Sequence, residues 1–169
     1  MKYALIVFSF ALVLAACKKK TEPCTLSAGT TVASANEESM ITAYLGSNSI
    51  NNAVELDNSG LYYIIEAAGN TDKPNQCSAM QVKYVGKLAN GNIFDQTTGT
   101  ATASFTLGGL IEGWKRTLPL VGEGGKMRLF VPPSMGYGAN GLINPNTGVV
   151  IIPPNAILIF DVEVVAVAN

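Results

Sequence analysis

The run AILIFDVEVVAV, residues 156–167, constrains the fold of this chain more than any other stretch. It is long and rich in β-branched residues, which favour strands because they pack well on a pleated surface. Its length and its place near the end of the chain suit a central antiparallel strand. We therefore expect a sheet in which this strand has neighbours on both edges.

Shorter strand candidates precede this run. They cover residues 61–67, 82–88, 103–107 and 126–131, and a further strand starts at Ile93. Asn90-Gly91 joins two of them, and both residues tolerate the positive φ of a tight hairpin turn. Residues 111–121 have helical character around Trp114, and Pro119 limits this helix. Strands with one short helix on one face predict an α+β domain.

Composition narrows the function. The chain has 169 residues, of which 48% are hydrophobic and 14% charged, and its formal net charge is −1. The length indicates one domain with an appendage. The chain also lacks the clustered Lys and Arg that are typical of a nucleic-acid-binding protein. The chain contains no histidine, which excludes Ser-His-Asp and Cys-His catalysis and every metal site that needs His. Any catalysis must use carboxylates, tyrosines, backbone groups or the shape of an apolar cavity.

The N-terminal residues 1–16 are predicted to be a signal peptide outside the fold. A charged start precedes an apolar stretch, residues 3–14, that is too short to span a bilayer. Leu14-Ala15-Ala16-Cys17 resembles the bacterial lipobox, in which the Cys is lipid-modified and begins the mature protein. We expect Cys17 to be the lipid attachment site rather than an incidental Cys. The protein would then be anchored to a membrane of the cell envelope, facing the periplasm or the surface.

Residues 17–59 are predicted to link this anchor to the main domain. Their first part is polar and small and indicates a tether, in which three lysines next to the lipid either meet anionic headgroups or are simply solvated. Residues 34–46 predict a helix that begins with the capping-box pair Ser34 and Glu37. We expect this helix to pack on the main domain or to contact a partner. The Asn- and Ser-rich residues 47–60 indicate a linker.

Asp95 raises a question because it follows two large apolar residues, Ile93-Phe94, just after the hairpin turn. A turn Asp that caps its own backbone is the ordinary structural interpretation. The functional interpretation is a hydrogen-bond acceptor placed in an apolar pocket. The rest of the chain decides between them.

Motifs in the main domain follow one another as in one known family. VKYVGKLANGNIFD (82–95), LIEGW (110–114), GEGGKMRLFVPPSMGYGANG (122–141) and IIPPNAILIFDVEVV (151–165) together resemble FKBP-type peptidyl-prolyl cis-trans isomerases. The resemblance covers about residues 60 to 168, and the helix ahead of the domain is similar to that of lipoprotein members. It implies an isomerase domain over residues 60–169, in which a curved antiparallel β-sheet wraps around one short helix, with the N-terminal helix appended.

The resemblance also implies the residues of a proline-binding pocket. Trp114 would be its floor, and the hydroxyl of Tyr137 and the backbone N–H of Ile152 would bind substrate carbonyls. Asp95 would accept a hydrogen bond from Tyr84 and polarise the site. The implied catalytic residues are Asp95, Tyr137, Trp114 and Phe160, and the implied substrate-binding residues are Tyr84, Phe94, Leu110, Ile111, Ile151 and Ile152. The resemblance implies no cofactor and no metal.

The chain departs from the family pattern after Phe94-Asp95. The family often has an Arg and an aromatic residue here, whereas QTTGTATASF, residues 96–105, has no Arg and has Ala103 at the aromatic position. The segment LGGLIEGW, residues 107–114, is also shorter than the usual run of the family. We therefore expect Asp95 to lack a cationic partner and one wall of the pocket to be thinner.

The implied reaction suits a protein without histidine. Resonance across C–N gives an X-Pro amide a rotation barrier of about 18–20 kcal/mol. An apolar pocket that desolvates and twists the amide lowers this barrier, and no nucleophile is needed. The implied function is a peptidyl-prolyl cis-trans isomerase that assists folding of exported proteins. Its partners would be proline-containing polypeptides and, through the lipid anchor, a membrane, but no nucleic acid.

Two alternatives use the same fold differently. One is a binding module or chaperone-like holdase that binds Pro-containing or unfolded chains with little catalytic activity. The other is a structural lipoprotein that uses the domain only for contacts. The joint presence of Trp114, Tyr137 and Asp95 favours the isomerase, because a structural role needs no polar group in an apolar pocket.

Cys24 and Cys77 are the two cysteines that remain once Cys17 is acylated. An oxidising envelope permits a disulfide between them, which would staple the tether to the domain. Two independent thiols are an equal alternative, because the sequence does not give their separation.

The segment LINPNTGVVI, residues 142–151, is longer than in the shortest members of the family. In the resemblance this loop overhangs the proline pocket. Leu142, Ile143, Val149 and Val150 are apolar but lie among turn-forming residues. They either fold back as a small buried hairpin or stay partly exposed and hold apolar segments of a client. We favour the exposed arrangement, since exposed apolar surface usually marks an interaction site.

Overall fold

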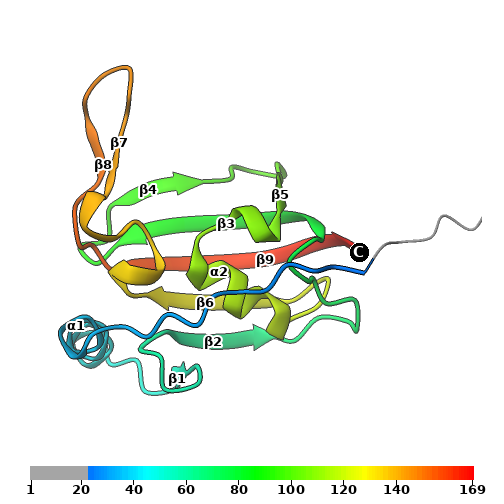
Figure 1. The fold of residues 1–169 in the computed structure, drawn as a ribbon, viewed down its shortest axis with the longest axis horizontal. Helices are drawn as coiled ribbons and strands as arrows, with labels where there is room; N and C mark the ends of the chain where they lie inside the picture. The colour runs from blue at the N-terminus through cyan, green and yellow to red at the C-terminus, as the bar shows by residue number, and fades with distance from the viewer. Residues whose placement is uncertain (1–22) are drawn as a thin grey trace, which may run out of the picture.

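An antiparallel β-sheet dominates the computed structural model, which describes residues 23–169. Its strands follow the order β1-β2-β6-β9-β3-β4, and β5 also pairs with β3 (Figure 1). They are β1 (Val54–Glu55), β2 (Tyr62–Ala67), β3 (Ala79–Leu88), β4 (Ile93–Gln96), β5 (Ala103–Thr106), β6 (Lys126–Val131) and β9 (Leu158–Ala168). The predicted α+β class and the predicted antiparallel sheet are confirmed.

Strand β9 lies in the middle of this sheet, as its sequence predicts. It pairs with β6 along one edge and with the whole length of β3 along the other. Its alternate residues Phe160, Val162 and Val164 are all buried. A strand with partners on both edges can pair its backbone N–H and C=O groups with the two neighbouring strands, so the β-branched run can be buried without unpaired N–H groups.

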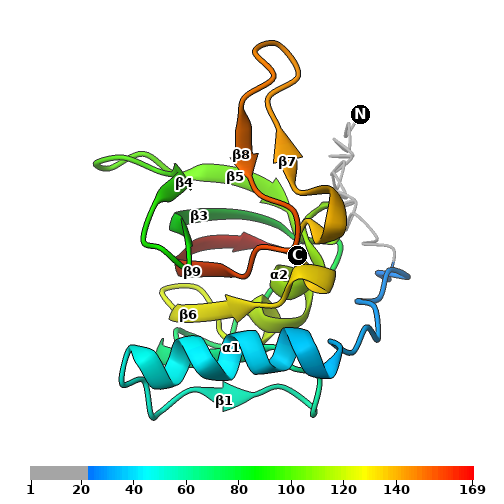
Figure 2. The same cartoon turned by 90° about the vertical axis from the view of Figure 1, so that its left-hand side faces the viewer.

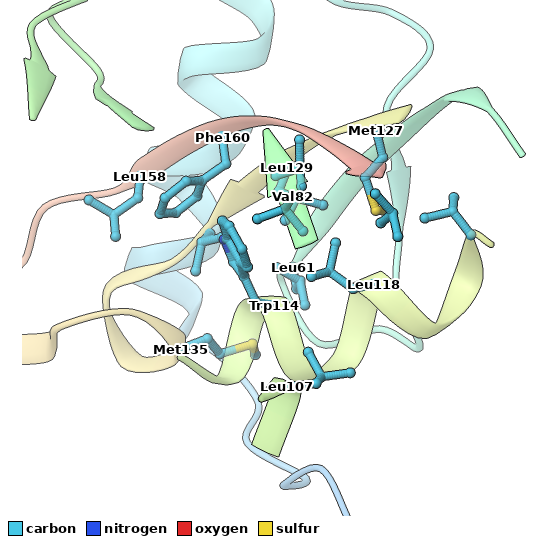
Figure 3. Packing of buried hydrophobic residues seen from close by; sticks show 14 of the residues in the cluster. Leu61, Val82, Leu107, Trp114, Leu118, Met127, Leu129, Met135, Leu158 and Phe160 are labelled. Carbon is cyan, nitrogen blue, oxygen red and sulfur yellow. The ribbon is translucent and has the colours of Figure 1, made fainter. Parts of the chain in front are cut away.

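One face of the sheet is covered by helix α2 (Glu112–Thr117) and the turns beside it, η1 (Leu107–Gly109) and η2 (Leu118–Leu120). Trp114 and Leu118 point from this side into a core that includes Leu129 and Phe160 (Figure 3). Pro119 lies in η2, directly after the α-helix, which confirms that it limits the helix. The sheet thus wraps around one short helix, as the resemblance implies.

Helix α1 (Ala35–Ser47) packs on the opposite face of the sheet (Figure 2). Both bonds of the predicted capping box are present between Ser34 and Glu37. Ile41 and Leu45 are buried with Phe130 of β6, whose sequence neighbour Leu129 belongs to the core on the α2 side. Successive side chains of a strand point to opposite faces, so α1 and α2 lie on different sides. The prediction that this helix packs on the main domain is confirmed.

The Asn90-Gly91 hairpin is present, but its turn differs from the one expected. The N–H of Gly91 donates to the carbonyl of Leu88 at 2.9 Å, and Gly91 has a φ of 86° while Asn90 has no positive φ. A turn that ends in a single left-handed glycine goes with a bulge at that glycine, and the N–H of Leu88 accordingly donates to the carbonyl of Asn92. A separate register shift in the β3–β4 pair lies between Gly86 and Lys87.

Residues 47–60 are more ordered than a linker. Strand β1 pairs with β2, and the buried Ser59 donates its N–H to the carbonyl of Leu56 at 3.0 Å. The pairing depends on β2, which follows later in the chain, so the local Asn- and Ser-rich composition does not reveal it. The linker prediction is wrong for this part of the segment.

The segment at 142–152 forms a separate hairpin of β7 (Leu142–Ile143) and β8 (Val150–Ile152). The hairpin projects away from the sheet, as both views show (Figures 1 and 2). Ile143, Val149 and Val150 have exposed fractions of 53%, 61% and 52%. The segment is therefore a hairpin in which Ile143, Val149 and Val150 stay exposed, as expected, while Leu142 is partly buried and Ile152 is buried.

Cys24 and Cys77 form a disulfide. Of the two arrangements that the sequence left open, the stapled one is present. The predicted signal peptide and Cys17 lie outside the described residues. Within residues 23–169, no helix combines the length and hydropathy needed to cross a membrane.

Candidate functional site

A pocket of about 310 Å³ lies between α2 and the inner face of the sheet. Ten residues line it: Tyr84, Phe94, Asp95, Phe105, Gly109, Leu110, Ile111, Trp114, Tyr137 and Phe160. They come from β3, β4, β5, β9, the start of α2, the turn before it and, for Tyr137, the segment that follows β6, so the pocket forms only when these elements pack together.

The indole of Trp114 is the floor of this pocket. Its side chain is nearly buried, with an exposed fraction of 4%. The rings of Tyr84, Phe105 and Phe160 stand almost perpendicular to it, at interplanar angles of 86°, 89° and 83° and centroid distances of 5.4, 6.2 and 5.3 Å. Edge-to-face contacts of this kind are favourable because the positive edge of one ring meets the negative face of the next. They enclose a flat apolar surface.

Local backbone geometry explains how α2 presents this floor. Ile111 is the N-cap of α2 and has an extended backbone, with φ −60° and ψ 152°. Leu110 and Ile111 therefore run along the pocket wall before the helix begins, and Trp114 follows within the first helical turn. Glu112 in this first turn and Lys115 and Arg116 in the last turn match the helix dipole.

Polar groups gather at the rim of the pocket. The hydroxyl of Tyr84 donates a hydrogen bond to the carboxylate of Asp95. Burial, with this hydrogen bond and the charge of Asp95, raises the pKa of Tyr84. Burial and the charge of Asp95 also raise the pKa of Tyr137, whose side chain lies at the rim with an exposed fraction of 36%. Both phenols are therefore protonated at neutral pH: the hydroxyl of Tyr84 donates to Asp95, and the hydroxyl of Tyr137 at the rim is available as a donor.

Among residues 23–169, none of the ion pairs includes Asp95. Its acceptor role toward Tyr84, which the resemblance implies, is present in the geometry. Asp95 is therefore a pocket residue that binds a phenol rather than a cap of its own turn.

The structure brings most of the predicted site residues together. Among the residues predicted to be catalytic or substrate-binding, Asp95, Tyr137, Trp114, Phe160, Tyr84, Phe94, Leu110 and Ile111 all line the pocket. Ile151 and Ile152 do not. Both belong to β8, which pairs with β7 rather than with the main sheet, and Ile152 is turned into the core with an exposed fraction of 1%.

Phe105 is the pocket residue that sequence reasoning missed. We expected a thinner wall because Ala103 stands at the aromatic position, and this expectation is wrong. Residues 103 and 105 share a face of β5, and Phe105 contacts Tyr84 and Trp114 from there. The alternation of ASFT was the available signal, since it places an aromatic ring one step further along the same face. Gly109 was also missed, and no pattern in the sequence singled it out.

The site is thus an apolar pocket with a flat aromatic floor, perpendicular ring walls and a polar rim. The comparisons with known proteins agree. The family described as FKBP-type peptidyl-prolyl cis-trans isomerase matches residues 70–165. The chain belongs to this family.

Individual relatives support the assignment. A probable FKBP-type peptidyl-prolyl cis-trans isomerase of Haemophilus influenzae is 41% identical over 115 residues, which are 68% of this chain and 45% of that protein. The crystal structure of FkpA from Escherichia coli has a TM-score of 0.67 and 34% identity, covering 80% of this chain and 61% of FkpA. A peptidyl-prolyl cis-trans isomerase of Pseudomonas syringae has a TM-score of 0.65 and 29% identity, covering 83% of this chain and all of that one. The chain spans less than half the length of the curated relatives that it matches.

Proposed function

We propose that this protein is a peptidyl-prolyl cis-trans isomerase that acts on proline-containing polypeptides. The buried indole of Trp114, enclosed by perpendicular rings, is the observation that carries the proposal. A proline ring is compact, apolar and nearly flat, so it fits such a box, and the flanking amide then lies at the polar rim. Family membership supports the same activity.

Desolvation and hydrogen bonding account for the catalysis. In the twisted transition state the amide loses its resonance and its charge separation, so an apolar site stabilises this state relative to the planar amide. Each tenfold gain in rate needs about 1.4 kcal/mol of such differential stabilisation. No bond to the substrate is made or broken, so Asp95 acts by fixing Tyr84 and by its charge, not as a nucleophile.

Two donors are suited to hold the substrate carbonyls. The hydroxyl of Tyr137 is one, because its raised pKa keeps it protonated. The backbone N–H of Ile111 is the other, since this pocket residue donates to no backbone or side-chain acceptor among residues 23–169. Ile111 thus takes the role that the resemblance assigned to the N–H of Ile152, which lies in the separate hairpin.

An NMR exchange or protease-coupled assay on an Ala-X-Pro peptide tests the proposal. The purified protein should accelerate isomerisation, and Trp114→Leu should abolish most of the acceleration because the floor is lost. Lys126→Ala is the control, since its ion pair with Glu163 lies outside the pocket lining. If the wild-type protein gives no acceleration, the enzymatic proposal is wrong, and the binding-module and structural alternatives remain.

A chaperone-like contribution is supported by the β7–β8 hairpin. Its residues Ile143, Val149 and Val150 are exposed although they are apolar, and the chain from Leu142 to Ile152 carries no charged residue. We propose that this hairpin holds apolar segments of a folding client while the pocket acts on its proline. The hairpin and the pocket together would assist the folding of exported proteins.

The lipid anchor at Cys17 remains our proposal for localisation in the cell envelope. The sequence Leu14-Ala15-Ala16-Cys17 supports it, and so does the Cys24–Cys77 disulfide, because disulfides persist mainly in oxidising compartments. Cys17→Ser should leave an unprocessed or soluble form in detergent phase separation. Unchanged partitioning of this variant would rule the anchor out.

A further inference from the structure

The N-terminal strap, defined as residues 24–33, runs along the outer side of helix α2. It lies outside residues 70–165, which match the family, so family membership assigns it no role. In Figure 1 it is the blue segment that crosses next to α2 before α1 begins. The disulfide from Cys24 to Cys77 fixes one end, and the N–H of Ala33 donates to the carbonyl of Ser59 at 2.9 Å at the other.

The disulfide joins two segments that each hold α2. The side-chain amide of Gln76, next to Cys77, donates to the carbonyl of Lys115 at 2.8 Å. The guanidinium of Arg116 donates to the carbonyl of Thr31 in the strap at 2.7 Å. Lys115 and Arg116, which directly follow Trp114, are therefore hydrogen-bonded to two segments that the disulfide joins.

Arg116 depends on the strap because it is nearly buried. Its side chain has an exposed fraction of 11%. Its other polar neighbours among residues 23–169 are weak: the sulfur of Met135 at 3.8 Å, and a carboxylate oxygen of Asp57 at 4.0 Å whose side chain is 81% exposed. A buried charge that loses its hydrogen-bond acceptor is costly, so displacing the strap forces Arg116, and with it α2, to move.

The strap also lies directly on the first turn of α2. A side chain added at Gly29 would place its Cβ 2.8 Å from a carboxylate oxygen of Glu112, so the strap lies against the Glu112 side chain there. Glu112 in turn pairs with Lys115 at 2.8 Å, with exposed fractions of only 13% and 22% for the two side chains. The strap thus contacts α2 at both ends, while the opposite side of the helix presents the pocket floor.

We propose that the N-terminal strap is a part of the isomerase site, and that Arg116 and Gln76 are positioning residues that set the place of Trp114 through it. The proposal rests on the proposed isomerase function for its catalytic consequence. A misplacement of catalytic geometry by about 1 Å can cost about a hundredfold in rate, so a small displacement of α2 has a measurable effect. Through the strap, the position of Trp114 in the pocket floor depends on the Cys24–Cys77 disulfide.

Trp114 is the only tryptophan in the chain, so its fluorescence reports the pocket floor directly. Acrylamide quenching of this fluorescence, measured well below the unfolding midpoint, and kcat/KM on an Ala-X-Pro peptide are the two readouts. In the double variant Cys24→Ser with Cys77→Ser, quenching should increase and kcat/KM should fall about tenfold. Arg116→Ala should give the same result with the disulfide intact, and Arg116→Lys should restore part of both.

Arg128→Ala is the matched control. Arg128 pairs with Asp161 at 2.5 Å and lies near Glu66, so its loss also destabilises the protein, but its side chain leaves β6 on the face opposite to that of Leu129, which faces the α2 side. Arg128→Ala should lower the unfolding midpoint while leaving the acrylamide quenching of native-state Trp114 fluorescence and kcat/KM at wild-type values.

Wild-type quenching and kcat/KM in both the double variant and Arg116→Ala would overturn the proposal, because the strap would then add stability alone. Should the double variant not fold, Arg116→Ala decides. If the wild-type protein has no isomerase activity, the proposed function is refuted instead. The quenching of the variants then still tests the positioning of Trp114: increased quenching supports it, and unchanged quenching refutes it.

Discussion

Gly86→Ala is the substitution for which the structure predicts the clearest effect on the pocket. Gly86 is buried in β3, and its register partners are Phe160 on β9 and Asp95 on β4. A Cβ at this position would lie 2.6 Å from Cζ of Phe94 and 3.0 Å from Cε1 of Phe160. The glycine is needed because the two pocket rings occupy the space in front of it.

The size of the effect follows from these distances. Carbon atoms pack at about 3.5–4.0 Å, so the ring of Phe94 must retreat by about 1 Å. Phe160 cannot yield, because it is buried and its ring already packs edge-on against Trp114 at 5.3 Å. Phe94 is half-buried and moves toward the cavity instead. Overpacking of this kind costs about 1–3 kcal/mol of folding stability, and a wall displaced by about 1 Å lowers kcat/KM by up to about a hundredfold.

Thermal unfolding and a tetrapeptide isomerisation assay measure both effects. Gly46→Ala is the matched control, since a Cβ there meets nothing within 4 Å and the residue lies in helix α1. It should raise stability by about 0.5–1 kcal/mol and leave kcat/KM unchanged. A Gly86→Ala protein with wild-type kcat/KM would show that the two rings do not form the substrate site, and one with wild-type stability would refute the packing argument.

Other perturbations separate the remaining parts of the site. Asp95→Ala and Tyr137→Phe should each lower kcat/KM about tenfold with little loss of stability, because both groups lie at the rim; a large fall in the unfolding midpoint would contradict this. Because the chain has no histidine and the pKa values of both pocket phenols are raised, kcat/KM should stay flat between about pH 6 and 9; a bell-shaped profile there would disprove it. Burial by itself would raise the pKa of Asp161, but hydrogen bonds from Arg128 and Lys87 and their charges hold that pKa below its usual value. The contribution of Asp161 to the free energy of unfolding should therefore be present above its unfolded-state pKa and be lost as the pH falls through its folded-state pKa, which denaturation curves at several pH values measure. Equal stability at acid and neutral pH would contradict the ion pairs of Asp161. Replacing residues 143–150 by a short Gly-Ser connection should spare tetrapeptide activity and reduce catalysed refolding of a Pro-limited protein. If both activities fall, the hairpin is part of the pocket, and if neither falls it is a surface insertion.

Local chemistry in the sequence determined the elements of this protein. The β-branched run predicted the central strand β9 because it is long and its side chains pack well on a pleated surface. The capping box at Ser34 predicted the start of α1, since cap and partner are three residues apart. Pocket residues within continuous motifs, such as Ile111 and Trp114 in LIEGW, could be assigned through the family resemblance, because the motif keeps them three residues apart.

Tertiary structure decided which distant residues meet. Phe105 rather than Ala103 completes the wall because the register of β5 on β3 brings it opposite Met80, next to Trp114. Ile152 leaves the pocket because β8 pairs with β7 instead of the main sheet. The pairing of Cys24 with Cys77 and the contact of Arg116 with Thr31 join segments far apart in the chain. Such contacts depend on strand register and on how helices and sheet pack, and no preference within a few residues encodes those distances.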